Sequence, residues 1–539
     1  MKLLFNTILK YKFTILILII LCSICVIYNY HIKFTTGFFI GIISALFSFF
    51  IINIISKIKY PIILIIPFIF FIALDLYFAV AYSESISMGI MASIIETNWV
   101  ETKSVMSDPT TLITAITAIL VTTSLTLLSV KELKHCTISI KSSLIILFAY
   151  LFLIVPIYFV YKITQNKDVN ENFRINKLYI IQELGSIVVP IIYGDILTFM
   201  AYRQEINTLN SYKTTKRDMP SGINKEKQRN TPEKIYLILG ESSSRDYYSL
   251  YGYNQPTTPF LDSLNYSNLD GFKYYEAVAP ASSTRESIKI SLSFATPKEG
   301  KYFYEYYNLV EMAKLAGYET FWISNQILIG FFETYIGFIS SCADYSFFDN
   351  DMNRCRDDLN LVKVLNNKYE NNKKQLFIIH LQGSHMRYSD KIDDIDREAI
   401  KDNTTFGDYA RTIHHTDRVL KEIYKIARRD SSSIMYYFSD HAEVVGKGHG
   451  FVTKGGRQFE VPLVTISTPD FSKPLDSIVN KYKVKEGFIN NVNTIYILSE
   501  IMGYTIDESN IKKALNDSEY ILHTNYKNYR YSDLEKGID

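Results

Sequence analysis

KIYLILGE, at residues 234–241, is an apolar run that stops at a glycine and a glutamate. A short run rich in isoleucine and leucine is typical of a buried strand that is covered on both faces. In open α/β sheets ligands bind at the carboxyl ends of the strands, because the loops that follow turn away and leave a crevice. This position predicts that Glu241 binds a metal ion. The alternative, that Glu241 only caps the next segment, fits this stretch equally well.

Similar apolar runs recur downstream and predict further strands. They lie at 320–324, 376–381, 434–438 and 463–466. Helical patterns lie between them, notably at 309–316 and 409–426. Because strands and helices alternate, we expect an α/β fold with a mostly parallel sheet and helices on both faces.

Polar side chains follow three of the predicted strands, the first of which leads to Glu241. His385 in QGSH follows the strand at 376–381, Asp440 and His441 in SDHAE follow the strand at 434–438, and His449 in GHG comes a few residues later. Carboxylates and imidazoles that meet at one edge of a sheet form a zinc-type ligand set. A lone histidine after a strand is more often a hydrogen-bonded structural group. The prediction of a zinc site therefore depends on several such residues following the predicted strands. Three other histidines lack this placement and are interpreted as structural: His380, His414 and His415.

A candidate nucleophile lies in APASSTRESIKI, residues 279–290. Its small and hydroxyl residues precede a helical pattern, so one hydroxyl is expected at a helix amino terminus, where free amide groups favour an alkoxide or a phosphate. A zinc ion within bonding distance lowers the pKa of such a hydroxyl. The alternative is that Ser282, Ser283 and Thr284 cap the helix together with Glu286. The two roles are compatible.

The first third of the chain is predicted to be a membrane anchor. Five apolar spans each approach the ~20 residues that cross a bilayer; they lie at 13–28, 36–55, 61–81, 112–130 and 143–161. Lysines collect on alternate sides, which places the amino terminus in the cytoplasm and the chain beyond about residue 164 outside it. We therefore expect a five-helix domain at 1–163, a linker at 164–230 and a catalytic domain at 231–539.

The loop between the third and fourth spans, around 85–110, is predicted to form an interfacial helix. Ser93, Thr97 and Glu101 are four residues apart, which places them on one helical face. Such a helix lies at the bilayer surface and directs its polar groups toward the outer domain. An ordinary interfacial helix is the equally compatible alternative.

The net charge and the cysteines indicate which partners and which compartment to expect. The formal net charge of +2 argues against a nucleic-acid partner, which usually requires a strong basic excess. Cys342 and Cys355 are close in sequence in the part expected to face an oxidising compartment, so we predict a disulfide between them.

Taken together, the motifs resemble a known family. GESSSRDYYSLYGYNQPTTPFLDSL, APASSTRES, QGSH, SDHAE and GHG, in this order behind five spans, resemble the phosphoethanolamine transferases of lipid A or lipopolysaccharide core, within the alkaline phosphatase and sulfatase superfamily. The resemblance implies a multi-pass protein of the bacterial inner membrane with its catalytic domain in the periplasm. It also implies one zinc ion or two, with these ligands: Glu241, Thr284, Asp440 and His441.

The same resemblance implies residue roles and a reaction. Thr284 is also the nucleophile, His385 and His449 bind phosphate or a second zinc ion and assist proton transfer, and Thr97 and Glu101 contact the donor. Phosphoethanolamine moves from phosphatidylethanolamine to lipopolysaccharide through a phosphothreonine, releasing diacylglycerol. An ethanolamine amine on an anionic surface weakens its attraction for cationic antimicrobial peptides.

Several departures leave the acceptor open between lipid A and a core sugar such as a heptose. The family often has Asn where this chain has Ser93, the nucleophile segment reads STRES without flanking cysteines, and GSHMR replaces GSHGP.

Three other functions fit parts of this pattern. Sulfatase chemistry requires a CxPxR-type segment, and STRES has neither its cysteine nor its proline. A glycerol phosphate transferase shares the spans, the threonine and the metal. A membrane-anchored scaffold would be favoured by loss of a ligand, yet the whole candidate set is present.

Overall fold

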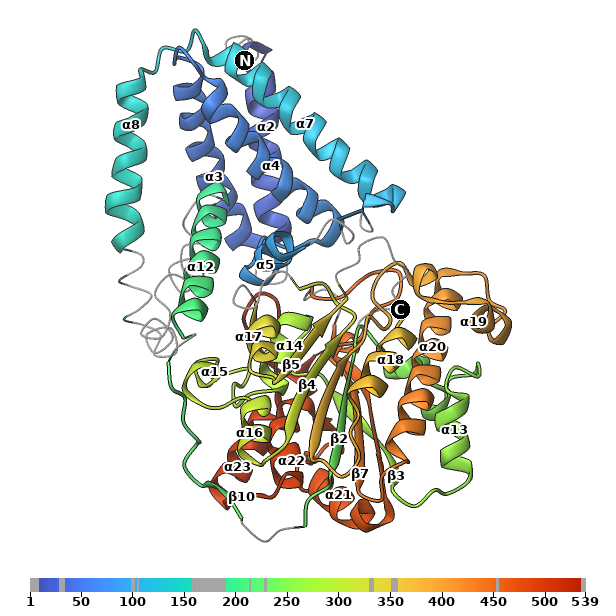
Figure 1. Ribbon diagram of the computed structural model, residues 1–539. Helices are drawn as coiled ribbons and strands as arrows, with labels where there is room; N and C mark the ends of the chain where they lie inside the picture. Colours follow the sequence, from blue (N-terminus) through green and yellow to red (C-terminus); the bar gives the residue numbers. More distant parts are fainter. Residues whose placement is uncertain are drawn as a thin grey trace. The chain divides into compact units, whose positions relative to one another are not determined.

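The protein was analysed as a computed structural model (Figure 1). It forms two compact units, Met1–Glu205 and Ile206–Asp539, which are described separately. The residues that the structure describes are 9–28, 34–97, 102–103, 106–157, 160, 164, 191–212, 215–226, 230–328, 334–349, 357–451 and 455–534.

The first unit is helical. Its elements are α2 (Lys12–Tyr28), α3 (Phe34–Ile55), α4 (Ile62–Tyr82), α5 (Met88–Glu96), α7 (Pro109–Leu133), α8 (Ile140–Ala149), the π-helix η1 (Tyr150–Ile154) and α12 (Ile191–Ser211). In the described chain, four segments are long and apolar enough to cross a membrane: Gly37–Ile55, Ile62–Tyr82, Pro109–Leu133 and Ile140–Ile157. The first of the five predicted spans forms the shorter apolar helix α2. Helix α12 lies inside the predicted linker.

Buried polar contacts join these apolar helices. Glu132 on α7 accepts hydrogen bonds from the backbone N–H groups of Phe13 (3.1 Å) and Thr14 (2.9 Å) at the start of α2. Asn53 Nδ2 on α3 donates to Ser143 Oγ on α8 (2.9 Å). In a bilayer such groups need protein partners, because no water is available in its core. These contacts therefore fix which helices are neighbours.

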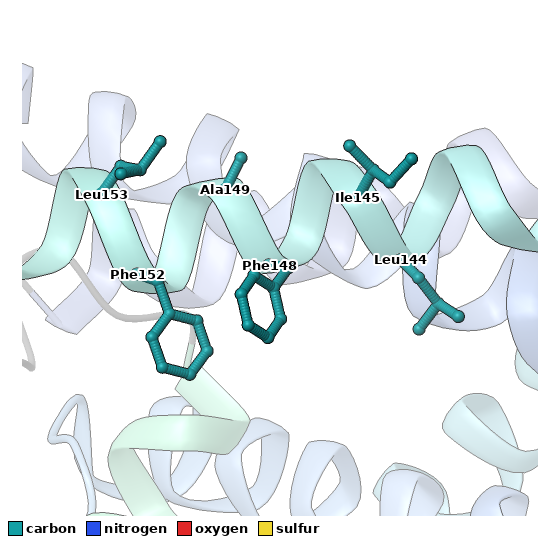
Figure 2. A pocket seen from close by; sticks show the side chains of 6 residues that line it. All are labelled: Leu144, Ile145, Phe148, Ala149, Phe152 and Leu153. Atoms are coloured by element: carbon teal, nitrogen blue, oxygen red, sulfur yellow. The ribbon is translucent and has the colours of Figure 1, made fainter.

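Apolar side chains project from α8 and η1 (Figure 2). A hollow along α8 and η1 is lined by Leu144, Ile145, Phe148, Ala149, Phe152 and Leu153. The rings of Phe148 and Phe152 stack with centroids 4.1 Å apart. Such a surface is the kind that lipid chains cover.

Helix α5 is shorter than the predicted interfacial helix. Ser87 caps its amino end by accepting a hydrogen bond from the Ile90 N–H, and the helix ends at Glu96. The backbone of Thr97 is extended, so the helical face predicted to run from Ser93 to Glu101 is interrupted there. Glu101 lies outside the described residues.

The second unit is built on an eight-stranded sheet, and all five predicted strands are present in it. The strands are β2 (Lys234–Gly240), β3 (Phe272–Val278), β4 (Glu319–Ser324), β5 (Tyr345–Phe348), β6 (Gln375–His380), β7 (Ser433–Ser439), β8 (Glu460–Ser467) and β9 (Ile489–Asn490). Their order is β5-β4-β6-β2-β7-β8-β3-β9. Of these strands only β8 is antiparallel to its neighbours. The predicted α/β fold with a mostly parallel sheet is confirmed.

Alternation along β2 separates two hydrophobic layers. Leu237 and Leu239 pack into the layer formed with α14 (Thr284–Ser291), α16 (Leu309–Leu315), α17 (Tyr335–Ser341), α21 (Pro469–Lys481), α22 (Thr494–Ile501) and α23 (Glu508–Asp517). Tyr236 and Ile238 pack into the opposite layer, with α13 (Pro259–Tyr266), α18 (Leu359–Lys368) and α20 (Thr405–Ala427). Because successive side chains of a strand point to opposite faces, a strand covered on both sides must be apolar throughout.

Smaller elements surround the sheet. They are β1 (Ile223–Lys225), paired with β10 (Tyr504–Ile506), β11 (Tyr520–Leu522), paired with β12 (Asn528–Arg530), α15 (Tyr302–Glu305) and α19 (Asp394–Ala399).

Candidate metal centre

The sheet brings the candidate residues to one edge. Gly240 at the end of β2 lies opposite Ser439 at the end of β7, so Glu241 and Asp440 leave neighbouring strands side by side. Because β8 is antiparallel to β7, the loop 440–459 must return to this same edge. That loop carries His441 and His449.

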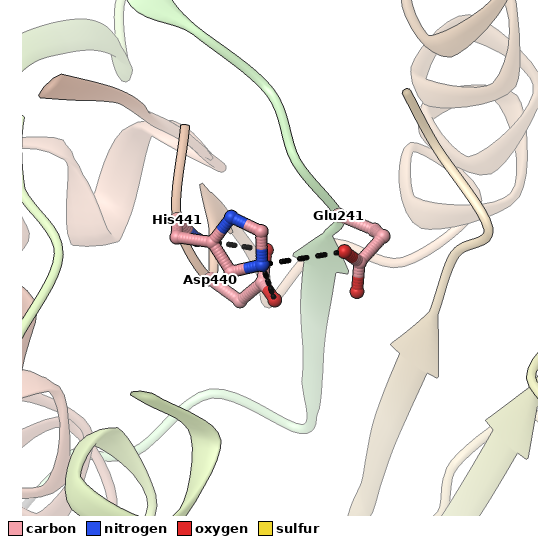
Figure 3. A group of neighbouring side chains, drawn as sticks. All are labelled: Glu241, Asp440 and His441. Carbon is pink, nitrogen blue, oxygen red and sulfur yellow. Dashed lines mark hydrogen bonds and ion pairs between the residues drawn. The ribbon is translucent and has the colours of Figure 1, made fainter. Parts of the chain in front are cut away.

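Three buried ligand-type groups meet there (Figure 3). His441 Nε2 lies 3.5 Å from Glu241 Oε1 and 3.3 Å from Asp440 Oδ2. Thr284 Oγ1 lies 3.2 Å from Glu241 Oε2 and 3.2 Å from His441 Nε2. The structure therefore gathers all four predicted ligands in one cluster.

The electrostatics of this cluster fit a cation. Burial, and then the charge of Asp440, raises the pKa of Glu241 well above its ordinary value, and burial also raises the pKa of Asp440. Burial lowers the pKa of His441. Asp440 Oδ2 is buried and has no hydrogen-bond partner among the described residues. Buried carboxylates that lack a compensating charge are costly, and two oxygen donors with a neutral imidazole suit zinc.

Local backbone geometry holds the carboxylates in place. Asp440 Oδ1 accepts hydrogen bonds from the N–H groups of Ser242 (3.1 Å) and His441 (2.7 Å). Ser242 has a positive φ of 53°, and its hydroxyl donates to Glu241 Oε1 (2.8 Å). The strained turn after β2 therefore presents Glu241 and fixes Asp440 at the same time.

Thr284 is the first residue of α14. The preceding residue, Ser283, makes no side-chain capping hydrogen bond. The Glu286 carboxylate accepts hydrogen bonds from Lys289 Nζ (3.2 Å) and the Tyr526 hydroxyl (2.6 Å). The alternative, in which Ser283 and Glu286 cap the helix, is therefore not supported, and the Thr284 hydroxyl lies against Glu241 and His441 at the amino terminus of α14.

His449 is oriented by a residue that the sequence analysis did not single out. Its Nδ1 lies 2.7 Å from Glu443 Oε2, and its ring centroid lies 3.9 Å from that of His441. Burial lowers the pKa of His449, but the charge and hydrogen bond of Glu443 outweigh it, and the pKa is raised. Glu443 also accepts a hydrogen bond from the Tyr388 hydroxyl (3.2 Å). The only sequence signal for Glu443 was its place in SDHAE.

His385 lies in the loop after β6, half-buried. Lys391 Nζ donates to its carbonyl oxygen (2.6 Å) and to that of Met386 (2.7 Å). The next residue back, Ser384, donates its N–H to the Glu241 carbonyl (2.9 Å), so this loop is tied to the metal-type cluster.

Other predicted residues lie elsewhere or are not described. Thr97 belongs to the first unit, and its hydroxyl donates to the Ser93 carbonyl. Cys342 ends α17, and its Sγ accepts a hydrogen bond from Asn308 Nδ2 (3.4 Å). Cys355 lies outside the described residues, so the disulfide stays a prediction. Of the histidines interpreted as structural, His414 and His415 both contact Asp396.

The chain is thus an α/β protein with a candidate metal centre at the carboxyl edge of its sheet. The family model described as Sulfatase matches residues 234–504, half of the chain, and the chain belongs to this family.

Among curated proteins, phosphoethanolamine transferase EptC of Escherichia coli O18:K1:H7 (strain RS218 / NMEC) is 26% identical over 362 residues, or 61% of each chain. The chain thus spans about three fifths of the length of the curated relatives that it matches first.

Two solved structures share the fold. The integral membrane protein lipooligosaccharide phosphoethanolamine transferase A (EptA) from Neisseria meningitidis has a TM-score of 0.59 at 16% identity and covers 93% of this chain and 94% of its own. The C-terminal periplasmic domain of EptC from Escherichia coli, in complex with Zn, has a TM-score of 0.51 at 23% identity and covers 59% of this chain and 97% of its own. At these identities the likeness concerns the fold alone.

Proposed function

We propose that this chain is a membrane-anchored, zinc-dependent phosphoethanolamine transferase. Its donor is phosphatidylethanolamine, its acceptor is lipopolysaccharide at lipid A or a core sugar, and its soluble unit works in the periplasm. The observation that carries the proposal is Thr284 Oγ1 at 3.2 Å from both Glu241 Oε2 and His441 Nε2, at the start of a helix. The names of the curated relatives support the choice of transferred group.

The chemistry is a two-step displacement at phosphorus. Thr284 gives up its hydroxyl proton as Oγ1 attacks the donor phosphorus and the bond to the diacylglycerol oxygen breaks, and that oxygen takes up a proton. A hydroxyl or phosphate oxygen of the acceptor then attacks the phosphothreonine, and Thr284 Oγ1 leaves. Both steps conserve phosphate, so no further reactant is needed.

The residues of the chain divide this work. Glu241, Asp440, His441 and Thr284 would hold zinc, which supplies Lewis-acid stabilisation and a lowered hydroxyl pKa when bound. The amino terminus of α14 favours the negative charge of the phosphoryl group. His449, with Nδ1 held by Glu443, is placed to give a proton to the leaving oxygen from its other nitrogen, and His385 shares this role or binds phosphate.

Membrane attachment suits these substrates. Donor, by-product and acceptor are all amphiphilic, and confinement to one surface raises their effective concentration. The four apolar helices support attachment. We also propose that Thr97 and Glu101 contact the donor.

The test is mass spectrometry of lipid A and core oligosaccharide, analysed separately, from cells that carry the wild-type protein or Thr284→Ala. We expect a phosphoethanolamine increment in one fraction that is absent with Thr284→Ala. If neither fraction changes while the protein is present and contains zinc, the acceptor proposal fails. A glycerol phosphate increment instead would indicate the rival transferase.

A further inference from the structure

The end of the chain, beyond the residues that match the family model, packs against the candidate site. The Leu522 N–H at the end of β11 donates to the Pro280 carbonyl (2.8 Å), and the Ser282 N–H donates back to the Leu522 carbonyl (3.3 Å). The segment therefore pairs with the stretch that leads into Thr284. The next residues, His523 and Thr524, are buried.

His523 connects this stretch to the loop that carries His449. Its Nδ1 lies 3.3 Å from Ser282 Oγ, and its Nε2 lies 3.3 Å from Gln458 Nε2. An amide nitrogen can only donate, so His523 Nε2 accepts and Nδ1–H donates to Ser282. Gln458 Nε2 has two hydrogens and also donates to the carbonyls of Phe451 (2.9 Å) and Gly455 (2.8 Å), so its donation to His523 is shared with these bonds. Burial lowers the pKa of His523 to about 4, which agrees with this neutral form.

Gln458 completes the connection. Its Oε1 accepts a hydrogen bond from the Gly450 N–H (2.8 Å), directly after His449, and its Nε2 donates to the Phe451 carbonyl (2.9 Å). The Thr524 hydroxyl donates to the Gly450 carbonyl. One continuous chain of hydrogen bonds thus runs from two residues before Thr284 to one residue after His449.

We propose that the segment 520–526 is a clamp that fixes the nucleophile stretch relative to the His449 loop, with His523 as its positioning residue. His523 does not contact the reacting groups; it acts through Ser282 and Gln458. The two loops that the clamp joins leave different strands, β3 and β7, so the clamp adds to the direct contacts between them, such as the hydrogen bond from Ser287 Oγ to the Asp440 carbonyl. The inference rests on the proposed function only for its kinetic readout.

The test compares full-length protein in detergent with His523→Phe, Ser282→Ala and the double variant. Phenylalanine keeps the edge-on packing that His523 makes against Phe459 (centroids 5.3 Å apart) and loses both hydrogen bonds. Asn528→Ala, at an exposed position of the same hairpin, is the control. The measurements are kcat and KM for phosphatidylethanolamine turnover, zinc content, and hydrogen exchange of peptides covering 280–284 and 448–451.

For His523→Phe we expect kcat to fall ~10–100-fold, because a misplacement of about 1 Å costs this much, with KM and zinc content unchanged. The double variant should be no slower than the slower single variant, because both break the same connection. Exchange should become faster in both peptides at once.

The inference is overturned by wild-type kcat in His523→Phe, by additive losses in the double variant, or by faster exchange confined to the hairpin 520–530. If the wild-type protein transfers nothing, the proposed function has failed, and hydrogen exchange alone decides whether the clamp exists.

Discussion

A substitution at Gly383 tests how Glu241 is held in the cluster that it forms with Thr284, Asp440 and His441. Its φ is +50°, and a Cβ at this position would lie 2.8 Å from the Glu241 carbonyl oxygen and 3.0 Å from the Glu241 nitrogen. The loop cannot retreat freely, because Asp358 accepts hydrogen bonds from the N–H groups of Gln382 (2.8 Å) and Gly383 (2.9 Å). Gly383→Ala must therefore displace Glu241 or strain the loop.

The expected cost has two parts. A left-handed backbone costs an L-residue about 1–2 kcal/mol, and forcing a methyl group into a packed site costs about 1–3 kcal/mol, so Gly383→Ala should lower the free energy of unfolding by about 2–5 kcal/mol. Gly317→Ala is the matched control. Its φ is +87° and no atom lies within 4 Å of the added Cβ, so it carries the backbone cost alone.

The assay follows denaturant unfolding by the fluorescence of Trp322, which is fully buried in β4, in a Trp99→Phe background, together with zinc content. We expect Gly383→Ala to lose zinc as well as stability, and Gly317→Ala to lose stability only. Equal losses in the two variants with full zinc content would refute the argument that this glycine protects the position of Glu241.

Three more predictions follow from named contacts. Burial lowers the pKa of His415, but hydrogen bonds to Asp357 and Asp396 outweigh it and raise it to about 10. The charged His415 ring therefore stabilises the fold fully below its ordinary pKa of 6.5, and this stabilisation is lost as the pH rises toward 10. His415→Asn should abolish this decline in the free energy of unfolding. A variant with the same pH profile as the wild type would contradict the prediction. Glu443→Gln should reduce kcat ~10–100-fold with zinc retained, because His449 loses its orienting carboxylate; loss of zinc instead would count against that role. Asp440→Asn should abolish zinc binding. Because it removes a buried anion beside Glu241, it should also make the metal-free protein more stable than the metal-free wild type at neutral pH. A less stable variant in calorimetry would contradict this electrostatic explanation.

The strands that lead to the ligand edge could be predicted because burial on both faces leaves a strong pattern, whereas their order in the sheet was not predicted. After Lys234, the strand IYLILG is apolar throughout, and the groups that follow it and YYFS in the sequence lie side by side, as parallel strands require. Strand β3 was not predicted, because its exposed Lys273, Tyr274 and Glu276 break the apolar run. The antiparallel direction of β8 could not be predicted, because a buried apolar strand has the same sequence pattern whether it runs parallel or antiparallel to its neighbours.

The roles of Glu443 and His523 could not be predicted because they depend on loop geometry. Glu443 becomes an orienting group only when the loop 440–459 folds back to bring His449 within 2.7 Å. His523 meets Ser282 across 241 residues of sequence, and no spacing rule connects such positions. The membrane part shows a further limit: the sequence predicts one helical face from Ser93 to Glu101, whereas α5 ends at Glu96.

The most direct test of the central claim is peptide mass spectrometry of the full-length, zinc-loaded protein after incubation with phosphatidylethanolamine vesicles and no acceptor. We expect a phosphoethanolamine increment on the peptide that contains Thr284, diacylglycerol released in equal amount, and neither product with Thr284→Ala. Donor consumption with the increment on another residue, or with no increment on any residue of the wild-type protein, would contradict it.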